Sequence, residues 1–374
     1  MPIEDALMRR IFSRQARKNK FNKIFSFVCV LMSAFLIIAA RNIDGFANTH
    51  VRFVTPVLTN TIGRFVSLFP FSVFELLIYS AAIFVVWGIF YVIYNVIKRN
   101  KEKVFSFLWG TTSLFCGLFL MMTMTVFVNF SRDSISEVLS IEVEMYTRDE
   151  LFRLTEFLIE RTNALAMEVY GDSDRRDDIN INEIIDESIR SMQRLGYKYP
   201  GFFGFYIRPK PVLFSRGMSH LRITGVFSPF TLEPNFSNDV EDYIIPFVIA
   251  HELAHTRGFM REDDANFIAY LAARDSENAF LRLSAEMNVL AYALRAVRMT
   301  GDAETYNRLR SSVDERVLAA YRRNAEHWRR FDTPVARVSV AANDLYLRAN
   351  AQRDGVQSYG RVIDLVFALY RDKL

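Results

Sequence analysis

Three long apolar runs near the start of the chain constrain its fold more than any other feature. Residues 24–40, 76–94 and 104–130 contain no charged side chain over 17, 19 and 27 positions, respectively. A helix needs about 20 apolar residues to cross the hydrocarbon core of a bilayer. We therefore predict transmembrane helices at about residues 24–40, 76–97 and 104–130, and a membrane anchor over residues 1–130 whose partner is the lipid bilayer.

Basic residues predict the orientation of this anchor. One cluster precedes the first apolar run, and another fills the short loop between the second and third runs. Short loops rich in Lys and Arg stay in the cytoplasm, so we expect a cytoplasmic N-terminus and an extracytoplasmic region at residues 131–374. A net charge of only +4, with basic residues gathered beside apolar runs, argues against a nucleic-acid partner. The clusters are Arg9, Arg10, Arg14, Arg17, Lys18, Lys20 and Lys23, and Lys98, Arg99, Lys101 and Lys103.

The loop between the first two runs has features of its own. Residues 51–69 are apolar with a few polar positions, and we expect them to lie on the membrane surface. Residues 45–47 loosely match a small-x-small cleavage site, so cleavage of the first span stays open.

Residues 131–374 show the pattern of a mostly helical α+β region. Thr147 and Glu150 form a capping-box pattern that opens a helix, and apolar residues at helical spacing also indicate a helix at residues 181–195. Helical patterns return over the last third of the chain. Short aromatic or β-branched runs broken by Pro and Gly predict a small sheet. These runs are residues 202–207, 212–215 and 221–227.

The segment Ile249-Ala-His-Glu-Leu-Ala-His255 carries the predicted chemistry. Positions i and i+4 share one helix face, so His251 and His255 can offer two imidazole nitrogens to one Zn²⁺ ion. Glu252 follows the first histidine, where a carboxylate can take a proton from water at the metal. Cysteine ligands are excluded from the outer region, because the chain has only two cysteines and both lie in apolar runs, Cys29 and Cys116.

A catalytic zinc site needs a third protein ligand, and acids follow the motif. Gly258 can end the helix in a left-handed turn, so that the chain returns towards the metal. We favour Glu262 as the ligand, with Asn266 one helical turn later to orient a ligand. Asp263 and Asp264 stay open as alternatives, although acids at these positions also suit the start of the next helix.

The group that would stabilise a tetrahedral oxyanion is not identified by the sequence. The sheet edge within residues 212–227 is a candidate for holding a peptide as an added strand. Glu233, shortly before the motif, is interpreted as a capping side chain in a turn rather than as a ligand. The oxyanion candidates are His220, His327, Tyr346 and Tyr359.

Several segments around the motif and near the end of the chain resemble those of a known protein family. These segments are residues 229–235, 246–255, 258–259, 262–271, 346–350, 352, 355 and 358–359. They resemble a family of uncharacterised bacterial membrane proteins with a domain of unknown function, regarded as zinc peptidases by their motif. More distantly, the motif with Glu262 resembles gluzincin peptidases, whose third ligand lies in a Glu-x-x-x-Asp pattern; Asn266 replaces the Asp here. The likeness implies a zincin-like metallopeptidase domain at residues 131–275 and a helical C-terminal subdomain at residues 276–374.

These features together predict a membrane-anchored zinc metallopeptidase that hydrolyses peptide bonds on the extracytoplasmic side. The substrate is expected to be a peptide or protein. The alternative is a zinc-binding extracytoplasmic sensor or interaction module without turnover. Glu252 argues against it, because a structural zinc needs no base beside its ligand. Cleavage within the bilayer is disfavoured, since residues 243–257 are too short to span it.

Overall fold

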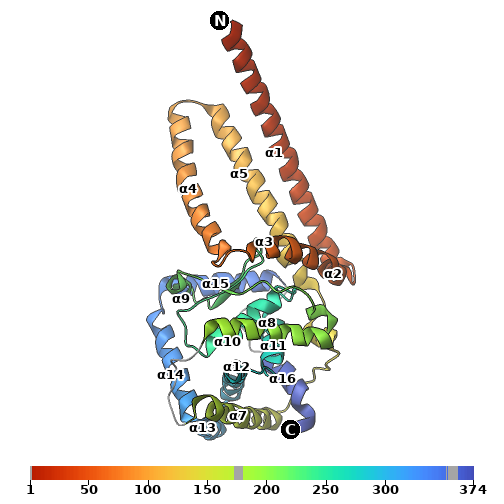
Figure 1. Cartoon of the computed structure of the whole chain (residues 1–374), viewed down its shortest axis with the longest axis vertical. Helices are drawn as coiled ribbons and strands as arrows, with labels where there is room; N and C mark the ends of the chain where they lie inside the picture. Colours follow the sequence, from red (N-terminus) through yellow and green to blue (C-terminus); the bar gives the residue numbers. More distant parts are fainter. Residues whose placement is uncertain (1, 172–179, 351, 353–360) are drawn as a thin grey trace.

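Three long helices leave one side of a mostly helical domain (Figure 1). The structure, a computed structural model, describes residues 2–171, 180–350, 352 and 361–374, with side chains from residue 15 onward. The long helices are α1 (Pro2–Asn42), α4 (Val73–Ile97) and α5 (Lys101–Met122). The segments Gln15–Asn42, Val73–Ile97 and Lys101–Ser131 are long and apolar enough to cross a membrane. The three predicted apolar helices are thereby confirmed, and each is longer than its apolar run.

A bent helical segment separates the long helices from the domain (Figure 1). It comprises α2 (Phe46–Leu58), the π-helical turn η1 (Thr59–Gly63) and α3 (Arg64–Val66). Its buried face includes His50, whose Nε2 lies 2.8 Å from the carbonyl oxygen of Met124 near the end of the third span. The segment also exposes large apolar residues, which are Phe53, Val57, Phe65 and, just beyond α3, Leu68.

Helix α5 continues into two short turns, the π-helical η2 (Thr123–Phe127) and the 3₁₀ turn η3 (Asn129–Ser131). The domain then follows as a set of helices around one hydrophobic core. In chain order these are α6 (Ile135–Leu139), α7 (Arg148–Tyr170), α8 (Ile181–Lys198), α9 (Ser215–His220), α10 (Ile244–His255), α11 (Glu262–Ala273), α12 (Ala279–Met299), α13 (Ala303–Ser311), α14 (Glu315–Arg330), α15 (Pro334–Ala349) and α16 (Val362–Tyr370). The turns η4 (Pro200–Phe202) and η6 (Arg371–Lys373) complete the set.

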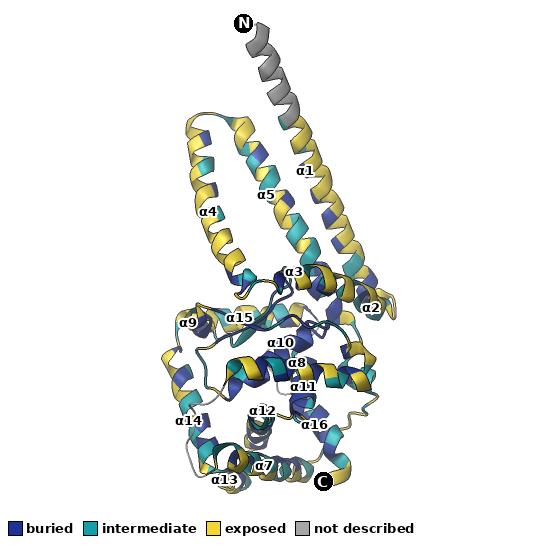
Figure 2. Ribbon diagram, viewed as in Figure 1, coloured by how far each residue is buried: buried dark blue, intermediate teal, exposed yellow. Residues whose placement is uncertain are grey.

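Local sequence signals and burial explain why the main helices form where they do. The predicted capping box opens α7, because the Thr147 side chain accepts from the Glu150 amide at 3.3 Å and the Glu150 carboxylate accepts from the Thr147 amide at 2.7 Å. Helix α10 lies inside the domain with every residue except Ile245 buried, whereas α4 is exposed along most of its length (Figure 2). Burial on all sides suits the nearly uniform apolar sequence of α10.

A three-stranded sheet lies beside α10, but only one of the predicted strands is in place. Strand β1 (Lys210–Pro211) pairs in parallel with β3 (Pro234–Phe236), which pairs antiparallel with β2 (Gly225–Phe227), in the order β1-β3-β2. Strand β2 lies within the predicted residues 221–227. The predictions for residues 202–207 and 212–215 are wrong, since η4 begins before the first and α9 begins at the end of the second.

The interpretation of Glu233 as a capping side chain is confirmed, and the helix that it caps is α4. The carbonyl oxygen of Glu233 accepts from the Ser228 amide at 2.9 Å, and its buried side chain caps this helix from far away in the sequence. The carboxylate accepts from the amides of Val73 at 3.0 Å and Phe74 at 2.7 Å. Lys210 lies 2.7 Å from the same carboxylate. A carboxylate at the N-terminus of a helix is stabilised by the helix dipole and by the unpaired amides there.

A second carboxylate extends this connection between α4 and the domain. Glu75, in the first turn of α4, accepts from the amides of Leu213 at 2.8 Å and Phe214 at 2.9 Å. The N-cap Ser72 also donates to the side chain of Asn235 at 2.7 Å. The start of the second span is therefore bound to the sheet by polar contacts from both sides, and the anchor and the domain form one packed unit.

We predict that Lys210→Met lowers the free energy of unfolding by about 3–5 kcal/mol, because it leaves the Glu233 carboxylate buried without its cation. Thermal unfolding of the full chain in detergent, followed by circular dichroism, measures this. Arg308→Met is the control: it removes an exposed pair with Glu156 at 2.7 Å and should cost less than about 1 kcal/mol. Equal losses in the two variants would contradict a special role for the buried pair.

Candidate metal centre

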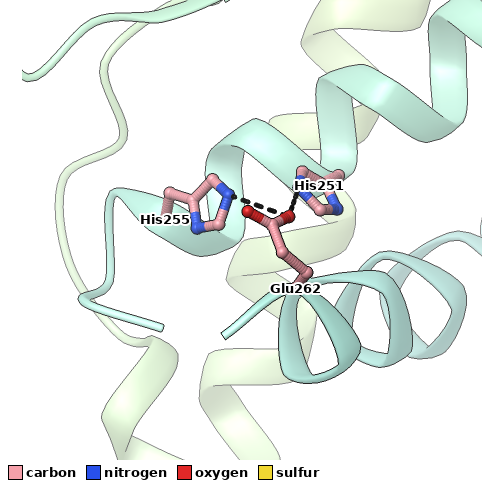
Figure 3. Close-up of side chains that lie close together, drawn as sticks. All are labelled: His251, His255 and Glu262. Atoms are coloured by element: carbon pink, nitrogen blue, oxygen red, sulfur yellow. Dashed lines mark ion pairs between the residues drawn. The ribbon is translucent and has the colours of Figure 1, made fainter. Parts of the chain in front are cut away.

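Two consecutive helices bring the predicted ligands together. His251 and His255 lie one turn apart on α10, which ends at His255. Gly258 follows with a φ of 79°, a left-handed conformation that glycine adopts without strain. The chain then reverses, and Glu262 begins α11. Figure 3 shows the carboxylate of Glu262 between the two imidazole rings.

The three side chains converge at distances that suit a metal ion. The Glu262 Oε2 atom lies 3.1 Å from Nε2 of His251 and 3.9 Å from Nε2 of His255. One ligand atom from each of the three residues falls within 4.8 Å of the others. Tetrahedral zinc with bonds of about 2.0–2.1 Å keeps its ligand atoms about 3.3 Å apart. The side chains therefore fit a zinc ion with small adjustments. Among the described residues, no second group of three His, Cys, Asp or Glu side chains meets in this way.

The outer nitrogens of both imidazoles are held by acceptors. Nδ1 of His251 lies 2.8 Å from Oδ1 of Asn266, and Nδ1 of His255 lies 2.5 Å from the carbonyl oxygen of Phe259. Acceptors at Nδ1 place the proton there and leave the lone pair of Nε2 for a metal. Asn266 thus makes the orienting contact that its spacing from Glu262 predicts.

Asp263 and Asp264, the alternative candidates for the third ligand, bind other residues instead. Asp264 accepts from the amide of Ile135 at 3.1 Å and pairs with Arg261 at 2.9 Å, which connects α11 to the start of α6. Asp263 accepts from the Gln352 side chain at 3.4 Å. Of the three acids, only Glu262 belongs to the group with His251 and His255.

Glu252 lies beside the ligands in a buried position. Its Oε2 atom has no hydrogen-bond partner among the described residues, an expensive state for a buried carboxylate. Burial, with a smaller contribution from the charge of Glu262, raises the pKa of Glu252 to about 8. Gly225 of β2 packs against it, and a Cβ atom at that position would overlap the carboxylate. A glycine here lets the edge strand pass directly over the Glu252 side chain.

The two histidines differ in their electrostatic surroundings when no metal is bound. Burial opposes a charge on His251, but the hydrogen bond and the charge of Glu262 outweigh it and raise the pKa of His251. Burial and the neighbouring His251 lower the pKa of His255 to about 4. His255 is therefore neutral, the form that binds a metal, over the whole physiological pH range.

The oxyanion candidates are separated by the fold. His220 and His327 pack against the ring of Phe331, with ring centroids 4.9 and 5.0 Å apart, in a cluster formed by α9 and α14. Tyr346 of α15 is close enough to the centre that burial and the charge of Glu262 raise its pKa. Tyr359 lies outside the described residues.

Sequence reasoning missed Tyr292 of α12. Its hydroxyl lies 3.5 Å from Nδ2 of Asn266, the residue that holds His251. Burial, with a smaller contribution from Glu262, raises the pKa of Tyr292 to about 12. No local pattern distinguishes it from a core residue, since α12 is mostly buried and the contact depends on how α12 packs beside α11.

The N-terminal helical region, which we predict to be a membrane anchor, forms part of the wall of this centre. A small cavity borders His255, and anchor residues from α2, η1, η2 and η3 line it together with residues from the β2–β3 region. Phe227 of β2 lies with its ring centroid 6.2 Å from that of His255. Val126 and Phe130 of the third span pack with Met260, two residues before Glu262. The lining anchor residues are Thr55, Leu58, Thr59, Thr125 and Asn129.

Asn266→Ala should weaken zinc binding by about 10- to 100-fold, since it removes the acceptor that orients His251. Competition with a chromophoric chelator measures the zinc affinity of the purified full chain. Asn288→Ala is the matched control, because Asn288 of α12 donates to the carbonyl of Ser284 at 2.8 Å and contacts neither histidine. Unchanged affinity in Asn266→Ala would argue against a metal bound through His251.

Comparisons with known proteins show the family of the chain but not its activity. No curated protein and no solved structure matches the sequence. The model of one family matches residues 50–367, which include the last two spans and most of the domain. The description of that family is "Protein of unknown function (DUF3810)". The chain therefore belongs to this family of proteins of unknown function.

Proposed function

We propose that the protein is a zinc-dependent metallopeptidase with a zincin-like domain held at the membrane surface by three helices. One observation carries the proposal. The Nε2 atoms of His251 and His255 and the carboxylate of Glu262 converge, with a buried carboxylate, Glu252, directly after the first ligand. Two histidines and one glutamate are a ligand set found in catalytic zinc sites of peptidases, which leaves one coordination position open.

Each residue has a distinct role in this proposal. Zinc, when bound, supplies Lewis acidity towards a carbonyl group and towards water. Glu252 accepts a proton from the attacking water and passes it to the leaving amine, a task suited to a buried carboxylate directly after the first ligand. Asn266 and the Phe259 carbonyl keep the two imidazoles in the orientation that presents Nε2 to the centre.

Two further features suit hydrolysis of a peptide bond. Strand β2 is at the edge of the sheet, and its Gly225 lies against Glu252, so an extended peptide added to β2 would pass the base. The Tyr346 hydroxyl, under the influence of the Glu262 charge, is our choice for the donor to the oxyanion.

The placement of basic residues supports an extracytoplasmic site. The N-terminus and the turn between α4 and α5 lie at the end of the spans that is remote from the domain (Figure 1). Basic clusters occur at both places, and such clusters stay in the cytoplasm. The domain and its centre then face the opposite side.

Metal content is the first test of the proposal. We expect the full chain, purified in detergent, to hold zinc in proportion to protein in elemental analysis, and His255→Ala to lose it because one of three ligands is missing. His220→Ala serves as the control, since His220 packs against Phe331 instead. Zinc-free wild type after reconstitution with excess Zn²⁺ would overturn the proposal.

Glu252→Gln separates catalysis from metal binding. The substitution keeps size and burial but removes the proton acceptor, so zinc should stay bound while peptide hydrolysis falls by about 10²–10⁴-fold. Cleavage of a mixed library of internally quenched peptides, read by fluorescence, compares the variant with wild type. Full retention of zinc with no hydrolysis in either protein would favour a zinc-binding module without turnover.

A further inference from the structure

Helix α15 has apolar side chains on two opposite faces. Its inner face includes Ala336 and Leu347, which are buried. Its outer face exposes Val338 by 69% and Leu345 by 70%, two turns apart. Further exposed residues on that side are Val335, Ala341, Ala342 and Ala349. A helix packed on a domain in water needs one apolar face, so the outer face requires an explanation.

The loop between β1 and α9 adds to this exposed apolar surface. Leu213 is 86% exposed, and Phe214 beside it is also exposed. Helix α15 and this region are connected, because the Ser339 side chain donates to the carbonyl of Leu221, directly after α9, at 2.8 Å. We call the outer face of α15 and the residues Leu213 and Phe214 the apical surface. It contains large apolar side chains that the described residues leave exposed.

Contacts with all three spans place the apical surface at the bilayer. Arg41 at the end of α1 donates to the carbonyl of Ala349 at 3.3 Å. Phe130, at the end of the third span, has its ring centroid 6.0 Å from that of Tyr346. Glu75 at the start of α4 accepts from the amides of Leu213 and Phe214. Figure 1 shows α15 and α9 on the side of the domain that faces the spans.

We propose that the apical surface lies in the lipid interface and holds the domain against the bilayer in addition to the three spans. The spans end at this surface, so lipid is the medium that meets it. Arg337 and Arg348 flank the apolar stripe of α15, although Asp332 and Asp344 pair with them, and long cationic side chains suit the level of lipid head groups. Tyr346, on the flank of the same helix, contacts Phe130 of the third span and feels the charge of Glu262, so α15 lies close to both the spans and the metal centre.

Lipid quenching of a single fluorophore tests this contact in the full chain. Cys29 and Cys116 are first replaced by alanine, and single cysteines are introduced at Val338, Leu345 or Leu213. Each variant is labelled with a nitrobenzoxadiazole maleimide and reconstituted into phosphatidylcholine–phosphatidylglycerol vesicles. Part of the phosphatidylcholine carries a nitroxide near the head-group end of its acyl chain. Met299→Cys, 76% exposed at the end of α12, is the matched control, and Ile83→Cys, 69% exposed on α4, gives the value for a label in lipid.

We expect the three apical labels to be quenched at least about threefold more than the label at Met299, and to approach the value at Ile83. Quenching at Val338 and Leu345 equal to that at Met299 would overturn the proposal. A blue-shifted emission at those positions without lipid quenching would also overturn it, because the surface would then be covered by protein, such as a second copy of the chain. The measurement requires neither zinc nor turnover, so its outcome is independent of the proposed function.

Discussion

The buried carboxylate of Glu233 connects the second span to the sheet, and the position of the metal centre depends on it. A buried carboxylate is costly unless it is paired and hydrogen-bonded. Glu233 finds its partners in Lys210 and in the first two amides of α4, Val73 and Phe74. The sheet therefore cannot move away from the start of the span without leaving a buried charge and two helix amides unpaired. This requirement holds the domain against the start of α4, one of the three helices long and apolar enough to cross a membrane.

A short series of contacts connects Glu233 to the metal centre. Glu233 directly precedes β3, and β3 pairs with β2, whose Gly225 packs against Glu252 on α10. The second connection runs through the third span, where Phe130 and Val126 pack with Met260 in the turn that leads to Glu262. Both sides of the centre thus depend on the anchor. This explains why anchor residues line the cavity beside His255, and it argues against regarding the three helices as a simple tether.

The sequence predicted the features that depend on residues close together in the chain. Apolar length revealed the spans, the capping pattern of Thr147 and Glu150 opened α7, and helical spacing placed His251 beside His255. The return of the chain through Gly258 follows from the conformational freedom of glycine. The features that the sequence did not predict depend on contacts between residues far apart in the chain. Strand β3 exists because Glu233 meets Lys210 and α4, and the contact of Tyr292 with Asn266 depends on helix packing. Short segments of two or three residues per strand carry too little periodicity to be recognised.

Access to the centre restricts what a peptidase of this shape can cut. The side chains of His251, His255 and Glu262 are only 11%, 9% and 13% exposed, so a folded protein surface cannot reach them. Helix α15 and the ends of the three long helices lie on one side of the centre, where the rings of Tyr346 and Phe130 meet edge to face. The edge of β2 lies beside Glu252, and an extended chain is the form of polypeptide that pairs with a strand edge. The proposed activity is therefore directed at unfolded or extended segments that run close to the membrane surface.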